Sequence, residues 1–253
     1  SYFFTASVTS GEQAVSSLFT IEVVGPSPPF SGTIFIDPDI ITDEDPTTFV
    51  GLLYTGQGAR TMFDRRADTW ITVDAYLFVA TWADGLQAEV QVNPEFASRD
   101  AAEVEAEVYA TAVGRLPVAL LQDVETLWIH RGVYPFGGGN KNILIHTGQG
   151  EQYAADGILE ETLVHEAAHT SLDPYHGSAA DWRRAQVADG TFISTYARDF
   201  PTREDVAESY LPYLAVRHRP SRISSSLAET ILETMPFRIE YFDSLALEVF
   251  PIG

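Results

Sequence analysis

The chain has no cysteine and only two methionines among its 253 residues. The absence of cysteine excludes a disulfide framework, a thiol nucleophile, an iron–sulfur cluster held by thiolates and a thiolate zinc site. Long hydrophobic runs are also missing, since no stretch approaches eighteen consecutive apolar residues. We therefore expect no membrane insertion.

Basic residues are scarce, because 15 Lys and Arg stand against 36 Asp and Glu and leave a formal net charge of −21. Such a surface repels phosphate backbones and anionic lipid, so nucleic acid is excluded as a partner. The same charge favours neutral or basic peptides over acidic ones. The lack of cysteine and the acidity both suit an exported protein, and we expect it to be secreted or on the cell surface. The chain opens Ser-Tyr-Phe-Phe with no visible signal peptide, which suggests a processed segment of something longer.

Apolar residues are plentiful enough, at 45% with 12% aromatic, for one large folded domain with an appendage. Residues 1–30 contain two β-rich stretches around Ser10-Gly11, followed by a proline-rich connector. We interpret them as a β-rich N-terminal extension or the remnant of an immunoglobulin- or cadherin-like module. A hairpin packed on the main domain is an equally supported alternative. Residues 31–253 then form the main domain.

The secondary-structure signals change from β to α along that domain. Trp70–Trp82 and Leu86–Val92 are strand-like and are joined by Asp84-Gly85, a strong hairpin signal. Asp100 is predicted to cap a helix that ends near Val113. Short strands are expected at Val124–His130 and Asn142–His146, around a glycine-rich turn at 136–140. The pattern predicts an α+β fold with a strand-rich upper part and a helical C-terminal part.

Three further helices are predicted after the second of these strands. One begins after Asp156, one uses Ser178 as its cap, and one opens at Thr202 with Asp205 closing a capping box. Pro212 is expected to kink or end the last helix.

The first of these helices carries the motif His165-Glu166-x-x-His169. Residues four apart share one face of a helix, so the two imidazoles can reach a single metal ion. Glu166 is one step round from His165 and is placed to deprotonate a water molecule on that metal. The flanking Leu163-Val164 and Ala167-Ala168 are apolar, which favours a buried helix over a pair of surface histidines.

A catalytic zinc ion needs a third protein ligand. The downstream candidates are Asp173, His176, Glu204, Asp205 and Glu208. The metzincin spacing fails, because its glycine falls on Leu172 and its third histidine on Tyr175. Glu204 and Glu208 share a helical face, so one can bind the metal while the other accepts a hydrogen bond from a ligand histidine.

This arrangement resembles the gluzincin type of zincin metallopeptidase. The stretch Tyr196-Ala197-Arg198 leading into Glu204–Glu208 is similar to the same region of anthrax lethal factor-like peptidases. The resemblance covers about Gly157–Tyr210. It implies a zincin-like fold, Glu204 as the third zinc ligand, Glu208 as the carboxylate that supports the site by accepting a hydrogen bond from a ligand histidine, and Tyr196 as the hydroxyl that stabilises the oxyanion. Tyr175 or His176 is the alternative to Tyr196 in that role.

The resulting expectation is a zinc-dependent endopeptidase that acts on a protein or peptide substrate. Zn²⁺ held by His165, His169 and Glu204 activates water, and Glu166 moves the proton. Asn142–His146 precedes the metal helix, where zincins place the edge strand that pairs with the substrate backbone. A strand buried in the core is the plainer interpretation of the same residues.

Two other functions stay open. The β-rich start suggests a catalytically inactive zincin-fold module for binding or adhesion in a larger exported protein, although an intact Glu166 argues against it. A metal-dependent hydrolase of a non-peptide bond is the second. The sequence does not indicate an oligomeric state.

Overall fold

The computed structural model describes residues 2–10, 13–21, 26–33 and 39–252. The main domain is built on a six-stranded mixed sheet, in the order β3-β4-β5-β6-β8-β7. Its strands are β3 (Phe49–Asp64), β4 (Thr69–Trp82), β5 (Gln87–Val92), β6 (Thr126–His130), β7 (Gly137–Gly139) and β8 (Asn142–His146). The predicted α+β class is confirmed.

The two halves of the sheet pair differently. Strands β3, β4 and β5 are antiparallel, and the predicted hairpin between β4 and β5 is present with Thr81 opposite Gln87. Strands β5, β6 and β8 are parallel, and β7 runs antiparallel to β8 at the edge. The sequence also predicts a short strand at Thr33–Ile36, which falls largely outside the described residues. The long strand β3 was not delimited by the sequence.

Of the two interpretations of Asn142–His146, the buried core strand is confirmed and the edge strand is wrong. Asn142–His146 lies inside the sheet, between β6 and β7, and all five of its residues are buried. A continuous apolar run is typical of such a two-sided strand. The edge is formed by Gly137–Gly139, which was predicted as a turn. Glycines carry no side-chain pattern, so their backbone pairing with β8 left no signal.

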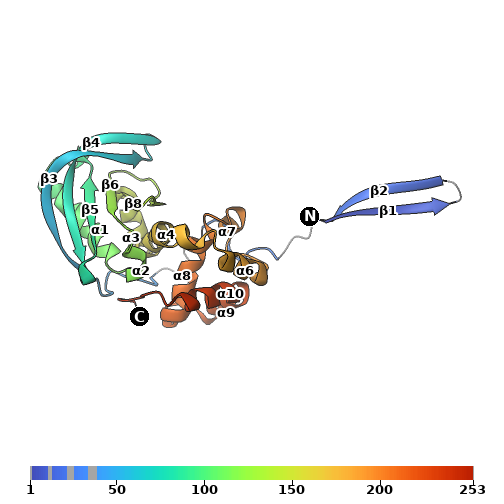
Figure 1. Ribbon diagram of the computed structural model, residues 1–253. Helices are drawn as coiled ribbons and strands as arrows, with labels where there is room; N and C mark the ends of the chain where they lie inside the picture. Colours follow the sequence, from blue (N-terminus) through green and yellow to red (C-terminus); the bar gives the residue numbers. More distant parts are fainter. Residues whose placement is uncertain (1, 11–12, 22–25, 34–38, 253) are drawn as a thin grey trace.

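Ten α-helices are present in the described part of the chain. They are α1 (Arg99–Val113), α2 (Val118–Leu121), α3 (Thr147–Ala155), α4 (Leu159–Ser171), α5 (Asp173–His176), α6 (Ala180–Asp189), α7 (Thr195–Asp199), α8 (Asp205–His218), α9 (Ser225–Thr234) and α10 (Pro236–Leu245). In Figure 1 the sheet lies on one side of α4, and α8 to α10, coloured orange to red, lie on the other.

Three helix starts differ from the prediction. Ser98 caps α1 in place of Asp100, because its hydroxyl accepts the N–H of Ala101. Helix α6 begins at Ala180 without a side-chain cap, so Ser178 does not serve as one. Helix α8 begins at Asp205, three residues later than predicted, and it continues through Pro212 to His218.

The carboxylate of Asp205 has a structural partner instead of a capping role. It accepts a hydrogen bond from Nε of the fully buried Arg238, at 2.9 Å, and Arg238 also pairs with Asp189 at 2.8 Å. Burying charge is unfavourable unless it is paired in this way. The network fixes the first turn of α8, which directly follows Glu204.

The core lies where α1 and α4 pack on the sheet. The apolar face of α4 is fully buried through Leu163, Val164 and Ala167, in the same cluster as Ile129 and Ile143 of the sheet. Each buried aliphatic side chain of this size stabilises the fold by about 1.5–3 kcal/mol.

The N-terminal strands β1 (Tyr2–Ser10) and β2 (Gln13–Ile21) form a separate two-stranded antiparallel sheet. The connector that follows contacts α7, where the carbonyl of Phe30 accepts the N–H of Thr195 at 2.9 Å. Among the described residues, none of the helices has the length and hydrophobicity that a membrane crossing requires.

Glu161 on α4 predicts a pH-dependent stability. Its side chain is buried and accepts the N–H of Ile41 at 3.0 Å, and burial raises its pKa to about 7. The folded state therefore binds this proton more tightly than the unfolded state, and the stabilisation is lost as pH rises from about 4.5 to about 7. We expect Glu161→Gln to raise the free energy of unfolding at pH 8 by on the order of 2 kcal/mol, with little change at pH 4.

Urea unfolding at the two pH values measures this effect. The exposed Glu229 on α9 provides the matched control, Glu229→Gln, which should be neutral at both. Equal stability of Glu161→Gln and wild type at pH 8 would contradict the prediction.

Candidate metal centre

Helix α4 brings the two histidines of the motif together, as their spacing predicted. The Nε2 atoms of His165 and His169 lie 3.1 Å apart. The side chain of His165 is buried and that of His169 is nearly so. Because the neighbouring residues Val164, Ala167 and Ala168 fill the core, both imidazoles share the face that leaves it.

Glu204 completes a group of three possible ligands. Its Oε2 atom lies 3.1 Å from Nε2 of His169 and 3.8 Å from Nε2 of His165. All three ligand atoms fall within 4.8 Å of one another, and the described residues contain no second group of this kind. The structure therefore brings together the three residues that the motif and the resemblance indicated.

Each histidine has a carboxylate near its other ring nitrogen. Nδ1 of His169 is 2.6 Å from Oδ2 of Asp173, and Nδ1 of His165 is 3.6 Å from Oε1 of Glu208. Glu208 is buried and also accepts a hydrogen bond from the hydroxyl of Ser194. Carboxylates in these positions orient ligand histidines and increase their basicity.

The partnership with Asp173 was missed by the sequence analysis, which treated this residue only as a possible ligand or part of a turn. Its signal was available, because Asp173 follows His169 by four residues. The chain leaves α4 and enters the short helix α5 there, so the one-turn spacing is kept.

The three possible ligands strongly shift one another's pKa values. Burial alone would lower the pKa of His169, but hydrogen bonds to Asp173 and Glu204 outweigh it and raise that pKa to about 10. Burial and the neighbouring His169 lower the pKa of His165 to about 3. Burial opposes ionisation of Glu204, but the two histidines lower its pKa overall. Two nitrogens and one carboxylate oxygen are the donor set of a catalytic zinc site, so these residues fit that ion.

Glu166 lies beside this group. Its side chain lines the same cavity, and burial raises its pKa to about 7. The backbone N–H of Gly138 in β7 hydrogen-bonds to it. A Cβ at Gly138 would lie 1.9 Å from the carbonyl oxygen of Glu166, so only glycine fits between the edge strand and the helix. No sequence pattern indicates this contact.

The edge strand is held against α4 from its other end. The hydroxyl of Thr170 accepts the N–H of Gly139 and donates to the carbonyl of Asn142, both at 2.9 Å. One side chain of α4 thus holds both β7 and β8.

These elements surround a cavity of about 520 Å³. Its lining consists of Thr33, Arg65, Pro135, Phe136, Gly138, Gly139, Tyr153, Thr162, His165, Glu166, His169, Asp173, Tyr196, Arg203 and Glu204. The hydroxyl of Tyr196, on α7, hydrogen-bonds to Glu204, and burial together with that carboxylate raises the pKa of the phenol.

The two alternatives to Tyr196 do not line this cavity. The side chain of Tyr175 is 62% exposed, and Nδ1 of His176 is hydrogen-bonded to the hydroxyl of Tyr241 at 2.7 Å. Of the three candidates for the oxyanion hydroxyl, Tyr196 is the one beside the possible metal ligands.

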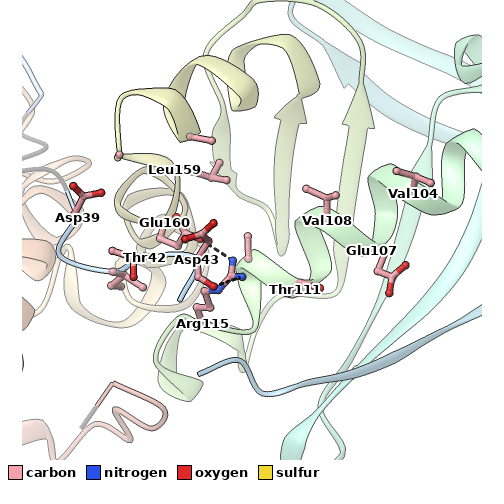
Figure 2. Close-up of a pocket in the computed structure, with 14 residues that line it drawn as sticks. Asp39, Thr42, Asp43, Val104, Glu107, Val108, Thr111, Arg115, Leu159 and Glu160 are labelled. Carbon is pink, nitrogen blue, oxygen red and sulfur yellow. Dashed lines mark hydrogen bonds and ion pairs between the residues drawn. The ribbon is translucent and has the colours of Figure 1, made fainter. Parts of the chain in front are cut away.

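A second cavity of about 530 Å³ lies between α1, the segment 39–43 and the start of α4. Figure 2 shows that its one arginine, Arg115, is directed between Glu160 and Asp43. Arg115 donates to the carboxylate of Glu160 at 2.8 Å and to the carbonyl of Asp43 at 3.0 Å. The cavity contains none of the histidines and its arginine is already paired, so it offers no comparable chemistry.

Comparisons with protein-family models, curated proteins and solved structures find no match to this chain. The function proposed below therefore depends on the geometry of the site and on the motifs that hold it.

Proposed function

We propose that this chain is a zinc-dependent endopeptidase with a zincin-like fold of the gluzincin type. The observation that carries the proposal is the convergence of His165, His169 and Glu204 at one point, with Glu166 on the wall of the same cavity. The adjoining edge strand β7 supports a peptide as substrate, because an extended backbone can add to a sheet edge.

The three ligands would hold Zn²⁺, whose chemistry when bound is that of a Lewis acid that makes water a nucleophile near neutral pH. Asp173 and Glu208 would fix the orientation of the two imidazoles. Glu166 would accept the proton of the attacking water and return it to the leaving amine. A pKa of about 7 suits both directions of that transfer.

The hydroxyl of Tyr196 would donate a hydrogen bond to the oxygen of the scissile carbonyl as negative charge develops there. Its hydrogen bond to Glu204, the proposed third ligand, supports this role. We expect Tyr196→Phe to lower kcat by about 100-fold while zinc content stays the same. Tyr175→Phe is the matched control, since Tyr175 lies outside the cavity, and steady-state kinetics compares the two. A larger loss for Tyr175→Phe would reverse the assignment.

The proposal is tested by zinc analysis followed by peptide cleavage. Protein purified without chelators or metal-affinity resin should contain about one zinc per chain, and it should cleave members of a mixed peptide library. Zinc without cleavage of any peptide would favour the inactive binding module. Cleavage of small esters without cleavage of peptides would favour a hydrolase of another bond.

A further inference from the structure

One wall of the cavity carries an arginine that the proposed chemistry does not use. Arg65 lies in the turn between β3 and β4, and its Nη2 atom donates to the carbonyl of Phe136 at 2.8 Å. Phe136 directly precedes the edge strand. A Cβ at Gly137 would lie 2.8 Å from the same Nη2 atom, so the guanidinium lies along the start of β7.

Arg65 is set apart by its lack of an acidic partner. Most basic side chains of this acid-rich chain form an ion pair, and examples are Arg60, Arg66 and Arg222. Within the described ranges Arg65 forms none, and the same holds for Arg131 and Arg183, but neither of those lines the cavity. No described carboxylate therefore forms an ion pair with the guanidinium of Arg65 at the cavity wall, although its charge acts on Glu166 across the cavity and opposes the rise of that residue's pKa.

The local balance of charge differs from that of the whole chain. The lining contains two arginines, Arg65 and Arg203, and three carboxylates, of which Asp173 is bonded to His169. A divalent cation bound by His165, His169 and Glu204 would make the positive charges of the lining outnumber the negative ones. The field inside a cleft depends on the nearest charges, because distant surface charges are screened at physiological salt.

We propose that the cleft selects peptides that present a carboxylate, and that Arg65 binds it at the start of β7. This inference rests on the proposed peptidase function and names its substrate class. A guanidinium has five N–H donors in a planar fork, and one of them is used by Phe136. The others can hold a carboxylate through two parallel hydrogen bonds. The preference for neutral or basic peptides, expected from the net charge, is thereby replaced by one for acidic groups.

The carboxylate can belong to an Asp or Glu side chain or to the free C-terminus of the peptide. The test uses quenched fluorescent peptides based on one cleaved library sequence. They carry Glu, Gln or Lys at each position flanking the scissile bond, and each is made with a free and with an amidated C-terminus. Dependence on Glu at one position identifies a side chain, and dependence on amidation identifies the terminus.

The variants are Arg65→Gln, Arg65→Glu and, as matched control, Arg183→Gln, which removes an exposed and unpaired arginine on α6. Wild type should prefer the carboxylate peptide over its amide by roughly 10- to 100-fold in kcat/KM. Arg65→Gln should remove that preference, Arg65→Glu should shift it toward Lys, and Arg183→Gln should leave it intact. Thermal unfolding shows whether each variant is folded. If Arg65→Gln or Arg65→Glu is unstable, Arg65→Lys is used in its place, and it should retain part of the preference because it keeps the positive charge.

A binding measurement separates this inference from the function on which it rests. Fluorescence anisotropy is measured with labelled library peptides that differ only in Glu or Gln and are taken whether or not wild type cleaves them, on zinc-loaded Glu166→Gln protein with and without Arg65→Gln. If wild type cleaves peptides without preferring a carboxylate, and Arg65→Gln has no effect, the inference is wrong and the proposed peptidase function stands. If the carboxylate peptide binds only when Arg65 is present, and wild type cleaves no peptide, carboxylate binding by Arg65 stands and the proposed peptidase function is wrong.

Discussion

Glu166→Gln is expected to lower peptide hydrolysis by about 10²- to 10⁴-fold while zinc content remains near one per chain. The amide keeps the size of the side chain and can still accept the N–H of Gly138, so the wall of the cavity is preserved. What it cannot do is accept and return a proton. The loss should therefore appear in kcat, with KM nearly unchanged.

The measurement is steady-state cleavage of a library-derived peptide, with zinc determined on the same samples. Glu151→Gln is the matched control, because Glu151 is exposed on α3 and does not line the cavity. Full activity of Glu166→Gln would remove Glu166 from the reaction and leave the proposed mechanism without a base.

The second large effect is expected for the metal ligands. His169→Ala removes the imidazole that lies between Glu204 and Asp173, so zinc should fall from about one per chain to near zero and activity should fall to background. Asp173→Asn keeps His169 as a ligand but weakens the hydrogen bond that orients its ring. We expect zinc affinity to fall by about 10- to 100-fold. His176→Ala, which removes a histidine outside the cavity, should keep its zinc.

Thermal unfolding supplies a second readout for the same variants. A ligand that binds only the folded state raises the melting temperature, so added zinc should stabilise wild type and His176→Ala but not His169→Ala. A zinc-dependent shift that survives in His169→Ala would place the metal elsewhere in the chain.

The part of the site that the sequence predicted is the part that rests on helical spacing. His165 and His169 share a face because they are four residues apart, and the apolar residues between and beside them fix which way that face points. Glu204 was indicated by resemblance, since no local rule connects it to a helix that ends more than thirty residues earlier. Its position depends on how α8 packs, which involves the buried pair of Asp205 and Arg238.

The rest could not be predicted because it depends on backbone contacts between distant segments. The glycines of β7 have no side chains whose alternation could reveal a strand, and the sequence left open whether their partner β8 lies at the edge or in the core. Arg65 reaches the cavity only because the long β3–β4 hairpin turns back toward Phe136. For both β7 and Arg65, the local sequence pattern contains no signal, and the position depends on tertiary packing.

The contact between Gly138 and the carbonyl of Glu166 has a consequence for how the cleft can move. Two backbones this close, without room for a single methyl group, cannot slide past each other, because protein interiors are packed as densely as crystals. The edge strand β7, Glu166 and the two histidines of α4 therefore move as one rigid unit. Any widening that admits a substrate or releases a product must come from another part of the cavity wall, such as α7, which carries Tyr196.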